Sequence, residues 1–161
     1  MVERTIAYAK ETHAMSIVYR IDKKIGITYV VWDGMVTDEE YHAHTQRMLA
    51  DPEWPPAGKR QFIDLTTVHS SNVISVRALQ EGIRQWNTLP EKIAGMRMVL
   101  VARDDFVDSP IFETMVPAFD PNILVFHTVP TACVWIGIDP ATTERVLDDL
   151  RAELRAQSPK R

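Results

Sequence analysis

The sequence has few cysteines, no clustered glycines and no long apolar run, and each absence excludes a class of protein. Cys133 is its single cysteine in 161 residues, so no internal disulfide or cysteine-cluster zinc site can form. Its 6 glycines are scattered singly, which excludes the dinucleotide and phosphate-loop fingerprints. No apolar stretch approaches the roughly 20 residues of a membrane-spanning helix. We therefore expect a reduced, cytoplasmic protein with no membrane span and no cofactor.

Excess positive charge is also missing. The chain has 18 basic and 22 acidic residues, a net charge of -4, which argues against a nucleic-acid partner or an anionic membrane surface. Residues 1–15 lack the basic segment and apolar core of a secretion signal. With 45% hydrophobic and 25% charged residues, the composition is that of an ordinary globular domain. We predict an N-terminal arm at 1–15, a single α/β domain at 16–156 and a frayed tail at 157–161.

The N-terminal half begins with a predicted hairpin and a capped helix. Alternating apolar residues at 16–22 and 27–32, joined by a short glycine-containing turn, are typical of two antiparallel strands. Thr37 and Glu40 have the spacing of a capping box, in which each side chain bonds the other residue's amide. A helix is therefore expected over 37–50.

Apolar runs predict three further strands, with helices between and after them. In chain order these are a strand at 60–65, a helix at 74–89, a strand at 96–102, a helix beginning at Ser109-Pro110, a strand at 123–127, a helical turn at 131–136 and a last helix capped by Asp139. Alternating strands and helices with short loops favour a mostly parallel sheet. We predict a mixed five-stranded sheet, mostly parallel with the first strand antiparallel near one edge, and helices packed on it.

Polar residues follow the predicted strands, where open parallel sheets bind their ligands. Our candidate ligand-binding residues are Asp33, Asp64, Thr66, Thr67, His69, Ser70, Ser71, Asn72, Asp104 and His127. The segment 66–72 leads into a helix, whose free amides and dipole suit an anion. Ser70, Ser71 or Asn72 is equally suited to cap that helix, which is the commoner role of such residues.

Catalytic and metal-binding patterns are weak. One triad can be constructed, with Ser70 or Ser71 as nucleophile, His69 or His127 as base, and a strand-end aspartate as its partner, but no Gly-x-Ser-x-Gly turn accompanies it. His42 and His44 are two residues apart on a helix and face different directions, so they cannot chelate one ion. We therefore expect no catalytic residue and no metal site, and the triad is kept as an alternative.

Apolar and aromatic residues are assigned mainly to the core. Trp32, Trp86, Trp135 and the buried thiol of Cys133 are expected inside the domain. Trp54 lies in a proline-rich loop and is expected to be partly exposed, as a weak indication of a partner surface.

Several of these segments together resemble a known fold. They are Trp32-Asp33-Gly34-Met35-Val36-Thr37-Asp38-Glu39-Glu40 after the hairpin, Phe62-Ile63-Asp64-Leu65-Thr66-Thr67-Val68, and Val125-Phe126 followed by Ala132, Trp135 and Ile136. The pattern, over about 16–138, is similar to the SpoIIAA-like or STAS (sulfate transporter and anti-sigma-factor antagonist) domains, closest to uncharacterised bacterial members.

The resemblance implies a βα superhelix that acts as a regulatory or ligand-sensing module without chemistry of its own. In anti-sigma-factor antagonists a serine at the start of the helix after the matching strand is phosphorylated. Asp64-Leu65-Thr66 matches that strand end, but Asn72-Val73-Ile74-Ser75 stands where an Asp-Ser-Ser-Gly run is usual. We expect a non-catalytic module, a homodimer, that binds a protein partner or a small anionic or apolar ligand near 66–72. The alternatives are a small hydrolase using His69 or His127, and a structural homodimeric assembly domain.

Overall fold

Five strands form one sheet whose spatial order follows the chain. The computed structural model describes residues 15–69, 74–119 and 122–157. The strands are β1 (Ile17–Asp22), β2 (Ile27–Gly34), β3 (Arg60–Val68), β4 (Arg97–Val101) and β5 (Ile123–Phe126). β1 pairs antiparallel with β2 and forms one edge, and every later pair is parallel. The predicted hairpin and mixed five-stranded sheet are thus confirmed.

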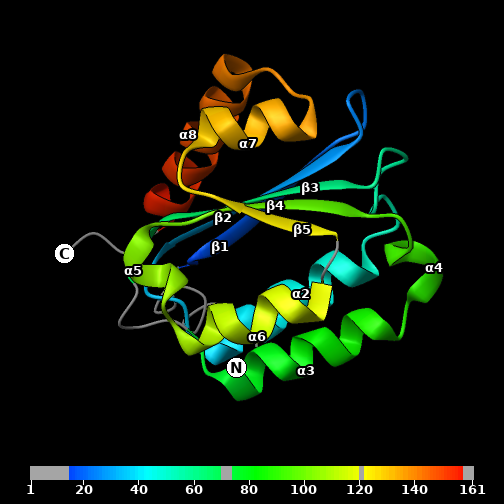
Figure 1. Cartoon of the computed structure of the whole chain (residues 1–161), viewed down its shortest axis with the longest axis vertical. Coiled ribbons are helices and arrows are strands. Elements are labelled where there is room, and N and C mark those ends of the chain that lie inside the picture. The colour runs from blue at the N-terminus through cyan, green and yellow to red at the C-terminus, as the bar shows by residue number, and fades with distance from the viewer. Residues whose placement is uncertain (1–14, 70–73, 120–121, 158–161) are drawn as a thin grey trace, which may run out of the picture.

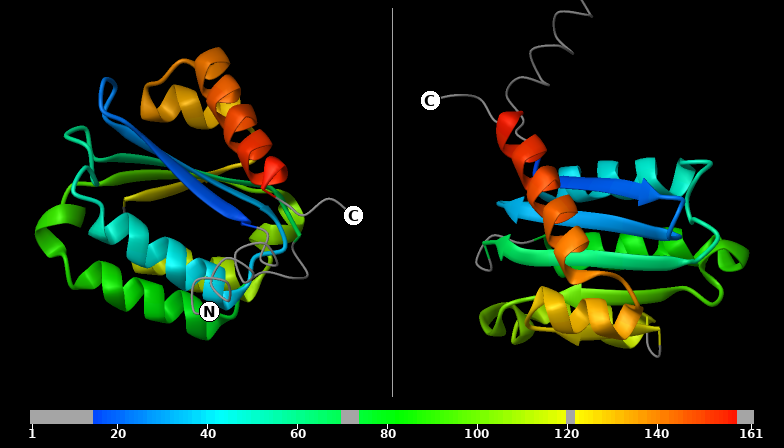
Figure 2. Two further views of the ribbon diagram at one scale, coloured as in Figure 1. Left: turned by 180° about the vertical axis from the view of Figure 1, so that it is seen from behind. Right: turned by 90° about the horizontal axis from the view of Figure 1, so that it is seen from above.

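Helices cover both faces of the sheet (Figure 1). They are α2 (Asp38–Ala50), α3 (Val76–Asn87), α4 (Pro90–Ile93), α5 (Asp104–Val107), α6 (Pro110–Phe119), α7 (Val129–Ile136) and α8 (Pro140–Ala156). Figure 2 shows α2, α3 and α6 on one face and α7 with α8 on the other. None of the helices in the described ranges is both long enough and apolar enough to cross a membrane.

The alternation of side chains along β2 divides the core into two layers. Val30 and Trp32 face α2, α3 and α6, whereas Tyr29 and Val31 face α7 and α8. Because helices cover both faces of the sheet, the side chains on both sides of β4 are buried, which explains its continuous apolar run.

Local signals in the sequence fix several helix ends. Glu40 donates its amide to Oγ1 of Thr37 (3.2 Å), and the Thr37 amide donates to Oε2 of Glu40 (3.1 Å), which confirms the capping box. Asp139 caps α8, as predicted, by accepting from the Thr142 amide at 2.8 Å.

The segment after β3 differs from the prediction. β3 continues to Val68 rather than ending at residue 65, because Thr67 and Val68 pair with the end of β2 beyond a bulge. α3 starts at Val76 and its cap is Ser75, so the predicted cap among Ser70, Ser71 and Asn72 is wrong. Those three residues lie outside the described ranges, as do most of the predicted arm and tail. Two short helices, α4 and α5, were not predicted.

Two tryptophans also differ from expectation. Trp54 is buried, 1% exposed, because its Nε1 donates to Oε1 of Gln61 at 3.1 Å and its ring meets Trp86 edge-on. Trp135 is 40% exposed, although its ring lies 6.3 Å from that of Phe126 and Cys133 and Ile136 of the same helix are buried. The expectation of a buried Cys133 is confirmed.

Candidate functional site

Asp64 is the most buried of the candidate residues that the structure describes, and it serves to hold the fold together. Its side chain is 1% exposed; Oδ1 accepts from the amide and the hydroxyl of Thr66, at 2.9 and 2.7 Å. Oδ2 accepts from Nη1 of Arg151, which α8 places over the end of β3. Burial opposes the charge of Arg151, but its hydrogen bond to Asp148 and its pairing with Asp64 raise the pKa above its usual value. The carboxylate therefore ties α8 to the sheet.

A second aspartate at this edge is similarly engaged. Asp33, at the end of β2, lies with Oδ2 3.4 Å from Nε of Arg155, one helical turn beyond Arg151. Thr67 donates its hydroxyl to the Trp32 carbonyl at 3.4 Å. Two of the carboxylates predicted to bind a ligand are thus paired with arginines of α8.

Arg103, which follows β4, also holds the end of β3. Its guanidinium donates to the carbonyls of Thr66 (3.1 Å) and Val68 (2.9 Å) and lies 3.2 Å from a carboxylate oxygen of Asp105. The His69 amide donates to the Gly34 carbonyl at 2.9 Å, which joins the ends of β2 and β3, and the residue is exposed. The main chain after β3 is therefore fixed up to His69.

His127 and Asp104 meet at the surface. Nδ1 of His127 lies 3.2 Å from Oδ1 of Asp104 and 3.2 Å from the carbonyl of Ala102. The two side chains are 61% and 93% exposed, and an exposed pair of this kind contributes only about 0–1 kcal/mol. The structure brings together one base and one carboxylate of the alternative triad, while its candidate nucleophiles lie outside the described ranges.

The positive end of α3 is filled by a carboxylate of the protein itself. Ser75 accepts from the Ala78 amide with its hydroxyl (3.1 Å) and donates that hydroxyl to Oδ2 of Asp38 (2.8 Å). The Ser75 amide donates to Oδ1 of the same carboxylate at 2.7 Å. The position suited to an anion is therefore held by Asp38, the first residue of α2.

A groove of about 420 Å³ opens beside this contact, between the N-terminal part of α2 and one side of α3. Charged and polar side chains line it together with Ala78: Asp38, Glu39, His42, Ser75, Arg77, Glu81 and Arg84. Glu81 pairs with Arg84, and this contact holds the pKa of the Glu81 carboxyl below its usual value. The groove carries both signs of charge on exposed side chains.

No metal centre is formed by the part of the chain that the structure describes, where no three histidine, cysteine, aspartate or glutamate side chains are placed to hold an ion. The two histidines of α2 are separated as predicted, with His42 exposed and His44 buried.

Sequence reasoning missed Arg103, Arg151, Arg155 and Asp38. Arg151 and Arg155 are four residues apart and so share one face of α8. This spacing indicates a basic face on α8. It does not indicate that α8 crosses the ends of β2 and β3, where the two arginines meet the aspartates.

Comparison with known proteins identifies the fold. No family model and no curated protein matches the sequence. An uncharacterised protein of the DUF3478 family with a SpoIIAA-like fold, from Shewanella loihica PV-4, has a TM-score of 0.51 at 16% identity, over 78% of this chain and 97% of that one. An anti-sigma factor antagonist from Mycobacterium paratuberculosis has a TM-score of 0.51 at 19% identity, over the same shares of 78% and 97%. The chain has the SpoIIAA-like (STAS) fold, as the resemblance predicted.

Proposed function

We propose that this chain is a non-catalytic regulatory module that binds a protein partner through the polar groove between α2 and α3 and the adjoining strand ends. The observation that carries the proposal is that some of its charged residues are paired within the fold while others are exposed in the groove. Asp33 and Asp64 are paired with arginines of α8, whereas the charges around Asp38 and Arg77 face the surface. The likeness to an anti-sigma factor antagonist supports a partner-binding role.

The candidate ligand residues take two roles in this proposal. Asp33, Asp64, Thr66 and Thr67 support the strand ends from within. His69, Asp104 and His127, which are exposed, are the residues that the partner touches in this proposal. Ser70, Ser71 and Asn72 are candidate contacts that lie outside the described residues. A cytoplasmic location and a homodimer are further parts of the proposal.

The chemistry of the groove sets the kind of partner. Arg77 and Arg84 stand beside Glu39 and Glu81, so the complementary surface carries both acidic and basic side chains. Such a surface steers a folded protein partner into one orientation, because charges of both signs must match.

Site-specific photo-crosslinking in the cells of origin tests this assignment. A photoreactive residue at position 42, in the groove, is compared with one at position 144, on the exposed side of α8. We expect a discrete adduct from position 42 only, lost in Arg77→Glu and retained in Arg145→Glu, a matched charge reversal on α8. Equal adducts from both positions would contradict the proposal. So would hydrolysis of esters or phosphates by the purified chain that His127→Gln abolishes, since this supports the hydrolase alternative.

A further inference from the structure

β5 is the last strand of the sheet, and one of its two edges has no partner strand among the described residues. It pairs with β4 alone, and α6 and α7 lie on the two faces of the sheet beside it (Figure 1). An open strand edge presents unpaired main-chain amides and carbonyls, which native proteins commonly protect with charged side chains or proline. The segment Ile123–Phe126 contains neither. This edge is therefore able to pair with another strand.

The pairing with β4 determines which main-chain groups of β5 point outward. The carbonyls of Asn122 and Phe126 accept from amides on the β4 side, at 2.7 and 3.0 Å. In a parallel pair, alternate residues direct both of their main-chain groups to the same neighbour, so the even-numbered residues of this segment face β4. The amides and carbonyls of Ile123 and Val125 consequently point to the open edge.

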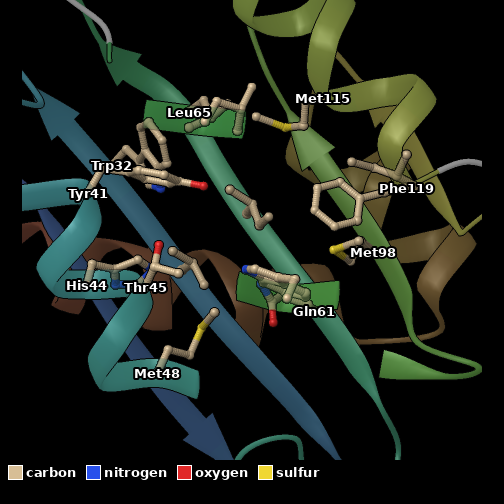
Figure 3. A pocket seen from close by; sticks show the side chains of 15 residues that line it. Trp32, Tyr41, His44, Thr45, Met48, Gln61, Leu65, Met98, Met115 and Phe119 are labelled. Carbon is tan, nitrogen blue, oxygen red and sulfur yellow. The ribbon is translucent and has the colours of Figure 1, made fainter. Parts of the chain in front are cut away.

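The two faces of β5 differ in what covers them. Ile123 is buried on the α6 side, where it lines a cavity of about 50 Å³ together with Met98, Met115 and Phe119, which Figure 3 labels. That space has room for only a few water molecules, so this face is closed. Leu124 points to the other face, on the side of α7, and is 40% exposed.

Exposed apolar side chains gather on the α7 side of this edge. Of the five large hydrophobic residues that are exposed in the described structure, three belong to β5 or α7: Leu124, Val134 and Trp135. The ring centres of Trp135 and Phe126 are 6.3 Å apart, so the indole lies beside the end of β5. Residues 122–138 contain no lysine, arginine, aspartate or glutamate, although these make up 25% of the chain. The open edge and the helix beside it therefore form an apolar surface without formal charge.

The absence of charge selects the occupant of this surface. A charged side chain brought against it would lose water without gaining a partner, which is unfavourable. A second copy of the same surface brings no such group and no like-charge repulsion, although the whole chain has a net charge of -4. We propose that β5 pairs antiparallel with β5 of a second copy, so that the two sheets join into one. This inference rests on the homodimer of the proposed function, for which it names the interface, and it is separate from the α2–α3 groove.

A two-fold axis at Leu124 pairs all of the outward main-chain groups. Ile123 of one copy then faces Val125 of the other, and each such pair exchanges both of its main-chain hydrogen bonds. Leu124 faces itself across the axis, where the two Cα atoms of an antiparallel pair of this kind are about 4.5 Å apart. The same axis keeps α7 of both copies on one face of the joined sheet, so their exposed apolar side chains lie on the same side of the contact.

The size of this contact predicts a weak dimer. β5 has 4 residues and α7 has 8, whereas a stable interface uses about 20–30 residues on each side. The contact is therefore too small for a permanent dimer. We expect the wild-type chain to exchange between monomer and dimer, with a Kd of about 1–100 µM.

Sedimentation velocity over a range of concentrations measures this association, with charged residues at position 124 as the probe. Leu124→Lys and Leu124→Glu each place two like charges on the axis, and either should weaken the dimer at least about tenfold. An equimolar mixture of the two variants places opposite charges there and should restore a dimer. As a control, Met35→Lys adds the same charge at a residue that is 61% exposed and lies between β2 and α2, and it should associate as wild type does.

The possible results separate this interface from the rest of the proposed function. A dimer that both Leu124→Lys and Leu124→Glu leave unchanged would overturn the β5 interface and keep the homodimer. Two variants that circular dichroism shows to be folded, and whose mixture stays monomeric, would overturn it as well. A wild-type chain that remains monomeric at millimolar concentration would overturn both the interface and the homodimer, and this result does not depend on any variant folding. Crosslinking from position 42 is independent of all three results, because the α2–α3 groove is formed by other residues.

Discussion

Acidification from pH 7 to pH 5 should destabilise this protein through His44. The imidazole is buried and neutral in the folded state, with a pKa of about 3. In the unfolded chain its pKa returns to the ordinary value of about 6.5. Below that value the unfolded state binds the proton and the folded state does not, so the free energy of unfolding falls as the pH falls.

The size of the effect follows from the two pKa values. Each pH unit below the unfolded pKa costs about 1.4 kcal/mol until the folded pKa is reached, so the loss between pH 7 and pH 5 is about 2 kcal/mol. The charged or polar groups around His44 include Arg47 on its own helix and the Tyr19 ring of β1, whose hydroxyl donates to Asp51. Carboxyls whose pKa is held low, such as that of Glu81, titrate below the range between pH 7 and pH 5.

Urea unfolding followed by tryptophan fluorescence measures the loss directly. The wild type is compared with His44→Asn, which cannot titrate, and with His42→Gln, which removes an exposed histidine of the same helix. We expect wild type and His42→Gln to lose about 2 kcal/mol more than His44→Asn between pH 7 and pH 5. The comparison uses the change with pH, so a constant destabilisation of the variant does not affect it. An equal loss in wild type and His44→Asn would refute the neutral, buried state of this imidazole.

Three further changes test the packing that supports the site, each by urea unfolding. Asp64→Ala should cost about 3 kcal/mol, because it removes the buried partner of Arg151, whose side chain is itself only 17% exposed. Gly82→Ala should cost about 1–3 kcal/mol, since the added Cβ would lie 2.3 Å from the Tyr41 hydroxyl oxygen. Ser75→Ala should cost about 1 kcal/mol by removing the cap of α3.

The controls for these variants are a substitution of an exposed aspartate and a second substitution that removes a steric clash. Asp104→Ala removes a carboxylate that is 93% exposed and should change the unfolding free energy by less than about 0.5 kcal/mol. Combining Tyr41→Phe with Gly82→Ala removes the atom in closest conflict and should recover part of the loss. A full additive loss in the double variant, or an equal cost for the two aspartates, would contradict the contacts described.

The fold was predictable where the signal is local. The hairpin, the Thr37–Glu40 capping box and the apolar run of β4 depend on residues within a few positions of one another. The end of β3 was not predictable from local signals. The threonines at 66 and 67 are polar enough for a loop, whereas pairing with the end of β2 extends the strand through them.

Long-range contacts account for the other differences. Trp54 is buried because Gln61 and Trp86 meet it, and neither contact follows from its proline-rich surroundings. The candidate aspartates were located at the correct sheet edge, but their pairing with α8 depends on the angle at which that helix crosses the sheet. That Asp38 occupies the end of α3 likewise depends on how two helices pack.

Hydrogen exchange on the complex with the partner caught by crosslinking at position 42 locates the surface through which the chain binds that partner. Amides of α3 and of the N-terminal part of α2 should become protected, while those of α7 and α8 should exchange as in the free chain. Protection confined to α7 and α8, with α2 and α3 unchanged, would contradict the proposed surface.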